Sequence, residues 1–222
     1  MNAKLFLFVI ILFTLSSCAK KAVFSSGISP TEINQMTVFE PISYINLITK
    51  GDNAVYSDSL SRISQKLWLN TLELNNYRLP IESYIILDDH FSRSLIENET
   101  RTLFDEIDAL DQFYSIPIPP TLKSHLEVSG NRFGMLTLTS GFTRTKGNLT
   151  GQMFKSIGIG LLTLGMVMII PETAQSNVHV LILDNELDEV VYYKASTSQE
   201  MQPLKEKTLH RQLEYLYKDY FW

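Results

Sequence analysis

The feature that most constrains the fold is an alternation of short β-branched runs with stretches whose apolar residues recur every three or four positions. This alternation is typical of a sheet covered by helices. Five runs predict strands, at 42–48, 81–87, 132–142, 177–183 and 190–194. Four stretches predict helices, at 58–72, 92–114, 121–129 and after Pro203. We therefore expect a single α/β domain with a sheet of about five strands and about four helices.

The last two predicted strands indicate how the sheet is connected. They flank the polar turn Asp184–Asp188 directly, with no helix between them. A direct hairpin joins antiparallel strands, whereas a strand–helix–strand unit joins parallel ones. The sheet is therefore expected to be mixed.

An apolar segment begins the chain. Met1 to Lys4 is a short positive region, and Leu5 to Leu15 is an apolar run whose single polar member is Thr14. A bilayer-spanning helix needs about 20 apolar residues, so this run is too short to span. Its length and flanks are those of a secretory signal peptide.

The residues that follow, Leu15-Ser16-Ser17-Cys18, resemble the bacterial lipobox, and Cys18 is the single cysteine of the chain. The resemblance implies cleavage after residues 1–17, a diacylglycerol on the Cys18 sulfur and a further acyl chain, typically palmitate, on its amino group. Two or three chains anchor a protein permanently. Ala19, in place of the Asp that retains such proteins in the inner membrane, implies the outer membrane, facing the periplasm. The alternative is an ordinary secreted protein cut near Ser17.

Residues 18–38 are expected to form a flexible tether, and 39–222 the α/β domain. Lys20 and Lys21 would lie beside the lipid headgroups. The Ser-, Gly- and Pro-containing stretch that follows shows neither helical nor strand periodicity. The alternative for Met36–Phe39 is an ordered extension packed on the domain.

Composition argues against several classes of function. A formal net charge of −5 argues against a nucleic-acid partner, and a single cysteine excludes both a disulfide scaffold and a thiolate metal site. The four histidines are too far apart for metal-ligand spacing, and no phosphate-binding or dinucleotide-binding glycine loop is present. We expect no cofactor and no metal.

A Gly- and Met-rich hydrophobic insertion at 144–175 separates two predicted strands. Ser156 to Ile170 carry no charge; as a helix this part would be about 22 Å long, shorter than the roughly 30 Å hydrocarbon core. Four interpretations of the insertion remain open: it is buried against the domain's own sheet, contacts a partner or second copy, inserts into the membrane surface near the anchor, or forms membrane hairpins. The candidate contact residues are Phe154, Ile157, Ile159, Leu161, Leu162, Leu164, Met166 and Met168.

Two passages, 126–136 and 178–192, resemble the TolB N-terminal domain and related envelope lipoproteins. The first is similar to their helix–Gly–strand passage, and the second to their hairpin, although it lacks the glycine that such turns commonly carry. These relatives include CsgG-like secretion lipoproteins and lipoproteins that activate penicillin-binding proteins. The resemblance implies a shared α/β fold over 39–222 and no catalytic residue.

Asp88-Asp89-His90 is the candidate catalytic group. It follows a predicted strand, where open α/β sheets place their sites, and carboxylates beside a histidine can run acid–base chemistry. Asp89 also stands where a helix cap is needed. The sequence therefore favours a lipid-anchored, non-enzymatic envelope protein that acts through protein contacts as an accessory or assembly component. A hydrolase using Asp88, Asp89 and His90, and a CsgG-like secretion-pore subunit, are the alternatives.

Overall fold

The computed structural model describes residues 23–24, 28–49, 51, 53–110, 115–145, 173–218 and 220–221. Their strands are β1 (Val23–Phe24), β2 (Met36–Phe39), β3 (Ile42–Ile48), β4 (Ala54–Tyr56), β5 (Ile81–Ile85), β6 (Phe133–Arg144), β7 (Ala174–Asp184) and β8 (Glu189–Gln199). Their helices are the short 3₁₀ helix η1 (Pro30–Glu32), α2 (Asp58–Leu74), α3 (His90–Ala109), α4 (Pro120–Ser129) and α6 (Glu206–Tyr217). The predicted α/β class is confirmed.

The eight strands form one mixed sheet organised around β6. Strand β6 pairs antiparallel with β7, and β7 pairs antiparallel with β8, as the predicted hairpin requires. On its other side β6 pairs in parallel first with β2 and then with β3. Strand β5 extends the sheet beside β2, and β4 extends it beside β3.

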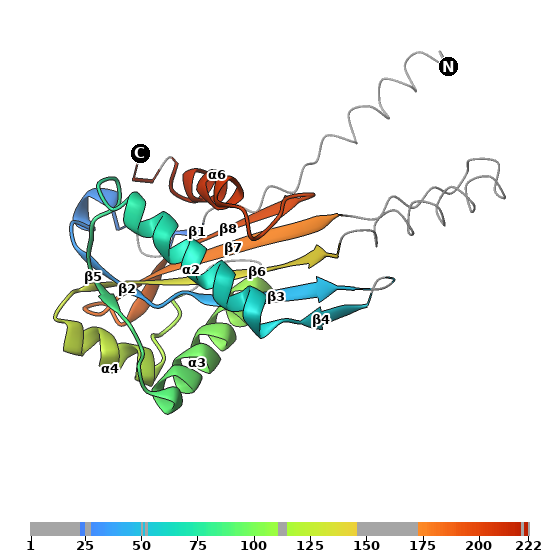
Figure 1. Ribbon diagram of the computed structural model, residues 1–222. Helices are drawn as coiled ribbons and strands as arrows, with labels where there is room; N and C mark the ends of the chain where they lie inside the picture. The colour runs from blue at the N-terminus through green and yellow to red at the C-terminus, as the bar shows by residue number, and fades with distance from the viewer. Residues whose placement is uncertain are drawn as a thin grey trace, which may run out of the picture.

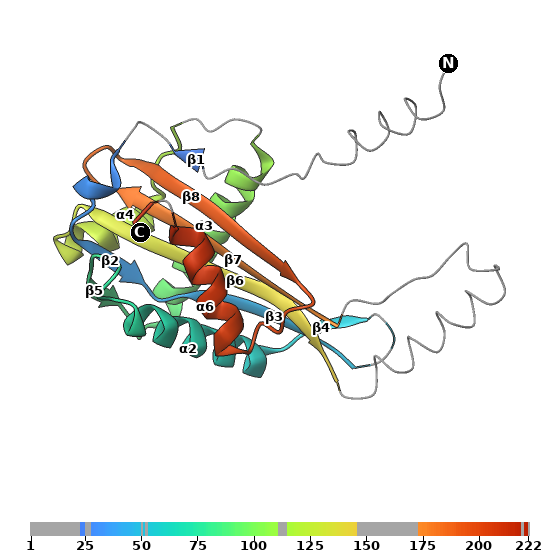
Figure 2. The same ribbon diagram turned by 90° about the horizontal axis from the view of Figure 1, so that it is seen from above.

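Helices cover both faces of the sheet and give a three-layer domain (Figure 1). Helices α2 and α6 lie on one face, and α3 and α4 lie on the other (Figure 2). Successive residues of a strand point to opposite faces, so Met135 of β6 packs in the core under α2 and α6, and Leu136 packs in the core under α3 and α4. The sheet is thus buried in its middle by two separate apolar cores.

Part of the predicted tether belongs to the domain. Residues 36–39 form β2, which is fully buried between β5 and β6, and η1 and Ile28 precede it in the ordered structure. The alternative of an ordered segment holds for this stretch, and the prediction of a flexible tether is wrong for residues 28–38. A run of four residues has too little periodicity to be recognised, because its burial comes from strands distant in the sequence.

Several other boundaries differ from the prediction. Strands β1 and β4 were not expected, and β8 extends to Gln199 instead of ending at Lys194. The added part of β8 is rich in Ser and Thr, so no apolar alternation marks it. Helix α3 ends at Ala109, and residues 111–114 of its predicted range lie outside the described residues.

Helix α4 is held to α3 by a carboxylate. Its N-cap residue is Pro119, which makes no side-chain cap. The amides of Thr121 and Leu122 instead donate to the two Glu99 carboxylate oxygens, at 3.1 and 3.0 Å. An anion near a helix N-terminus is favourable because the terminal amides have no partner within the helix. Glu99 therefore joins the two helices that cover this face.

Candidate functional site

The hydrophobic insertion separates two neighbouring strands at one end of the sheet. Thr143 near the end of β6 pairs with Ala174 at the start of β7, so the chain leaves and re-enters the sheet at adjacent positions. The β3–β4 turn lies at this same end, which we call the insertion end. Residues 146–172, including all eight candidate contact residues, and Cys18 lie outside the described residues.

The sheet continues past its helices at the insertion end. Figure 1 shows β6, β7 and the β3–β4 hairpin projecting beyond the helical layers. On the α3 side of this projection the side chains are largely polar and half-exposed: Ser140 accepts from Asn177 at 3.4 Å, and Asn177 also accepts from Gln175 at 3.2 Å. Phe142 on the same side lies under the Arg144 guanidinium, 5.8 Å from the ring centre. This surface offers little apolar area for packing.

A cleft of about 540 Å³ lies at the carboxyl ends of β2 and β5, between α2 and α3. Its wall is organised by Glu40, whose carboxylate accepts from the Arg93 guanidinium at 3.1 Å and from the Gln65 amide at 3.1 Å. The Leu87 amide also donates to Glu40, at 3.3 Å. Glu40 thus holds the cleft wall together and has little freedom to act as a base.

The candidate catalytic group does not converge on this cleft. The Asp89 carboxylate accepts from the Ser92 amide at 2.7 Å and caps α3, and this hydrogen bond lowers the pKa of Asp89. His90 lines the cleft, but neither aspartate does, and all three residues are exposed. Within the described ranges no three His, Cys, Asp or Glu side chains could together hold a metal ion. The shared pocket that the hydrolase hypothesis requires is not formed.

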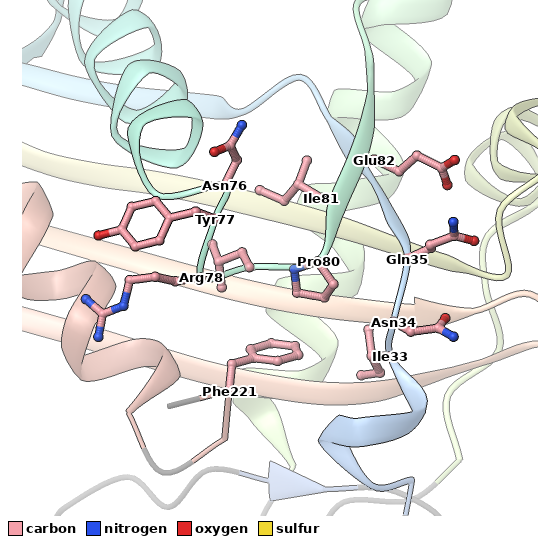
Figure 3. A pocket seen from close by; sticks show the side chains of 11 residues that line it. Ile33, Asn34, Gln35, Asn76, Tyr77, Arg78, Pro80, Ile81, Glu82 and Phe221 are labelled. Atoms are coloured by element: carbon pink, nitrogen blue, oxygen red, sulfur yellow. The ribbon is translucent and has the colours of Figure 1, made fainter.

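A second cavity of about 540 Å³ lies where the chain passes from α2 into β5, beside η1 and Phe221, the next-to-last residue (Figure 3). Arg78 and Glu82 are the charged residues in its lining, and Tyr77, at its rim, is 78% exposed. Its lining contains no cysteine, histidine, serine or threonine.

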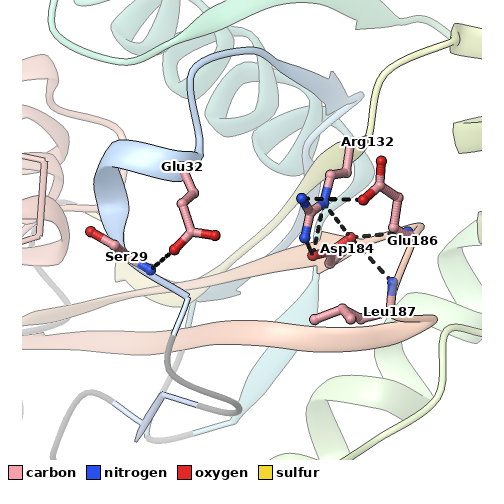
Figure 4. Close-up of polar contacts among 6 residues, drawn as sticks. All are labelled: Ser29, Glu32, Arg132, Asp184, Glu186 and Leu187. Atoms are coloured by element: carbon pink, nitrogen blue, oxygen red, sulfur yellow. Dashed lines mark hydrogen bonds and ion pairs between the residues drawn. The ribbon is translucent and has the colours of Figure 1, made fainter.

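Asp184, which ends β7 as the sequence indicated, stabilises the turn between β7 and β8 (Figure 4). It is fully buried and forms a bidentate ion pair with Arg132, and it accepts from the Glu186 amide at 2.9 Å. Hydrogen bonding to Asp184 raises the pKa of Arg132. The pair closes the β7–β8 turn.

A groove that the sequence analysis missed lies between α6 and β8. It has a volume of about 380 Å³, and its lining includes Ser196, Thr197, Ser198, Arg211 and Tyr215. The feature of the sequence that could have indicated this groove is the presence of basic residues in the last predicted helix. Only the packing of α6 on β8 shows that they lie beside hydroxyl groups of another element.

Within the described residues, no helix combines the length and the apolar character needed to cross a bilayer.

Comparisons with known proteins give weak similarities of fold. No family model matches the chain, and no curated protein matches it. The PelC dodecamer structure from Paraburkholderia phytofirmans is similar with a TM-score of 0.39 and 9% identity, over 89% of this chain and 92% of that chain. The LpoB C-terminal domain from Salmonella enterica is similar with a TM-score of 0.31 and 9% identity, over 79% and 87%. These values are too low to transfer a function, a partner or a site residue to this chain.

Proposed function

We propose that the protein is a lipid-anchored, non-enzymatic component of the bacterial cell envelope, attached through Cys18 to the outer membrane and facing the periplasm. It acts as an accessory or assembly component by binding a protein partner or a second copy of itself through the hydrophobic insertion. The lipobox-like residues 15–18 support the anchor, and the position of the insertion supports the contact.

The observation that carries the proposal is the insertion's place between β6 and β7. The two strands hold its ends side by side, beyond the helical layers. Exposed apolar segments normally mark an interface, and Met-rich ones suit adaptable contacts. The polar surface on the α3 side of the insertion end argues against folding the insertion back onto it, because burying hydroxyl and amide groups against apolar side chains costs free energy.

The non-enzymatic part of the proposal rests on how the carboxylates near the cleft are used. Asp89 caps α3, and Glu40 is held by Arg93 and Gln65. A general acid or base must be free to exchange a proton with a bound substrate. These carboxylates are instead engaged in contacts that stabilise the domain.

The register of the sheet gives a precise test of the insertion. Because Thr143 faces Ala174, residues 146–171 can be replaced by Asn-Gly, whose two-residue turn would close β6 onto β7 with the register kept. We expect this variant to fold, with a thermal unfolding midpoint within a few degrees of that of the unaltered protein. It should lose the crosslinked partner or oligomer that the unaltered lipoprotein shows in cells.

The matched control removes apolar area elsewhere on the surface. Val128 of α4 and Phe91 of α3 are 87% and 70% exposed, and Val128→Ser with Phe91→Ser should leave the crosslinking profile unchanged. An unchanged profile in the Asn-Gly variant, or an equal loss in the control, would contradict the proposed role of the insertion.

The anchor is tested separately. Cys18→Ala should move the protein from the membrane fraction to the soluble periplasmic fraction and abolish labelling by a clickable fatty acid. Retained labelling in this variant would show that Cys18 is not the lipid attachment site.

A further inference from the structure

The exposed side of α6 and the adjoining part of β8 carry an excess of positive charge on an acidic protein. Between Lys194 and Lys218 there are five basic residues and three acidic ones, whereas the whole chain has a formal net charge of −5. Helix α3, on the opposite face of the sheet, has five acidic residues and two basic ones. The segment from Lys194 to Lys218 and helix α3 therefore differ in the sign of their net charge.

Three of these basic residues lie on one side of the last helix. Lys207 and Arg211 of α6, and Lys218 directly after it, are exposed at spacings of four and seven residues, and the exposed acidic residue Glu214 lies among them on the same side. Lys194 of β8 extends this surface: its ammonium lies 4.9 Å from the centre of the Tyr215 ring. The same ammonium donates to the Lys218 carbonyl at 3.4 Å. We call these four basic residues, together with Tyr215, the basic face.

The groove between α6 and β8 opens beside the basic face. Arg211 and Tyr215 form one wall, and the hydroxyl-bearing residues 196–198 of β8 form the other. A guanidinium next to hydroxyl groups is the chemistry that binds phosphate oxygens. A half-exposed tyrosine is the residue type that is enriched where a bilayer meets water, and Tyr215 is 48% exposed.

Strand β1 places this surface near the predicted anchor. In β1, Val23 pairs with Tyr193 and Phe24 pairs with Tyr192 in an antiparallel arrangement, so the amino end of β1 points towards Lys194. Cys18 precedes Val23 by five residues, and five residues span at most about 18 Å. The link to the lipid is therefore much shorter than a 21-residue tether over 18–38 would be. This step rests on the proposed lipidation of Cys18.

We propose that the basic face and its groove dock on an anionic phospholipid bilayer and hold the domain in one orientation on the membrane that anchors it. The lipid phosphates lie against Lys194, Lys207, Arg211 and Lys218, and Tyr215 enters the headgroup layer. The acidic surface of α3, on the opposite side of the sheet, then faces away from the bilayer.

The test uses the full mature chain, 18–222, with Cys18→Ala, so that lipid attachment does not contribute to binding. Partition is measured by co-sedimentation with vesicles of phosphatidylcholine and with vesicles of an equal mixture of phosphatidylcholine and phosphatidylglycerol. Each basic residue near an anionic surface contributes about a fivefold change in partition. We expect K207Q/R211Q/K218Q to lower partition into the mixed vesicles at least tenfold, and the charge-preserving K207R/R211K/K218R to retain it.

The matched control removes the same charge from other exposed positions, with R62Q/K66Q/R101Q on α2 and α3. It should change partition less than twofold. An equal loss in both glutamine triples, or equal binding of the starting protein to the two kinds of vesicle, would overturn the proposal.

A photo-crosslinking residue at position 215 of the lipidated protein in cells checks the occupant. Crosslinks to phospholipid are expected, and crosslinks to a second copy of the chain or to another protein would overturn the assignment. If Cys18 is not lipidated, Cys18→Ala will not change the fractionation or the fatty-acid labelling of the protein. The vesicle comparison does not depend on that result, so the two proposals can fail separately.

Discussion

Arg132 and Asp184 join the start of β6 to the end of β7 by a bidentate ion pair, with the Arg132 Nε 2.9 Å from Asp184 Oδ1 and the Nη2 2.6 Å from Oδ2. Asp184 is fully buried, whereas Arg132 is about one-third exposed. Asp184 is also the cross-strand partner of Phe133, so the ion pair lies at the end of the sheet opposite the insertion. It therefore holds the far end of the two strands whose other ends carry the insertion.

Asp184→Ala is expected to lower the free energy of unfolding by about 3 kcal/mol, because it leaves the guanidinium and the Glu186 amide without their buried acceptor. Urea unfolding followed by circular dichroism measures the change. The control is Glu186→Gln, which removes the exposed 3.2 Å ion pair to the same arginine and should cost no more than about 0.5 kcal/mol. Similar losses in the two variants would show that burial of Asp184 does not decide the strength of the pair.

Gly141 is required where β6 passes β7 near the insertion. Its φ is 152°, and an added Cβ would lie 2.0 Å from the Gln175 carbonyl oxygen. Gly141→Ala should therefore lower the free energy of unfolding by more than about 2 kcal/mol. Gly130→Ala is the comparison, since Gly130 has a φ of 75° with no atom within 4 Å of the added carbon, and should cost only about 1 kcal/mol. Thermal unfolding of the two variants separates a steric clash from backbone strain alone.

Glu99→Ala should destabilise the domain by about 1 kcal/mol, because the first amides of α4 lose their acceptor. Glu106→Ala is a control on the same helix with an exposed side chain, and it should change the free energy of unfolding by less than about 0.5 kcal/mol. Hydrogen exchange should show faster exchange at Thr121 and Leu122 in the first variant. Unchanged exchange there would mean that Glu99 does not cap α4.

The C-terminal tyrosines predict the behaviour of the protein at alkaline pH. Tyr220 stacks on Tyr192 with ring centres 4.5 Å apart, and burial, followed by the negative charge of Glu32, raises its pKa to about 12. Because the folded state holds this proton more tightly than the unfolded state, stability should be constant below about pH 10 and fall as the pH rises towards 12. Tyr220→Phe should flatten this decline.

The comparison for this prediction is Tyr77→Phe, which changes an exposed tyrosine and should leave the alkaline decline as it is in the starting protein. Chemical unfolding at a series of pH values, with tyrosinate absorbance recorded in parallel, measures both variants. An unaltered decline in Tyr220→Phe would assign the alkaline loss of stability to other groups.

The elements that the sequence predicted well are those with a local pattern. Leu209, Leu213 and Leu216 repeat at helical spacing, and all three are fully buried in α6. Asp184 and Val190 mark the ends of a polar turn, and this hairpin is present. Such patterns are readable because the period of the backbone decides which side chains share a face.

The candidate catalytic group shows the limit of this reasoning. The sequence placed Asp88, Asp89 and His90 correctly after a strand, at the carboxyl end of β5. Adjacent residues at a helix start point in different directions, and the Ser92 amide competes for the Asp89 carboxylate. The three residues are therefore adjacent in the sequence but do not line a common pocket.

By itself, the sequence determined the α/β class, the four helices, the β7–β8 hairpin and the place of the insertion between two strands, because each of these depends on patterns that repeat over a few residues. Only the tertiary structure decided that Met36–Phe39 is an inner strand, that Glu99 caps α4 and that Arg211 shares a groove with the hydroxyl groups of β8. Each of these depends on contacts between segments far apart in the chain. Their partners are chosen by burial and hydrogen bonding in the assembled layers.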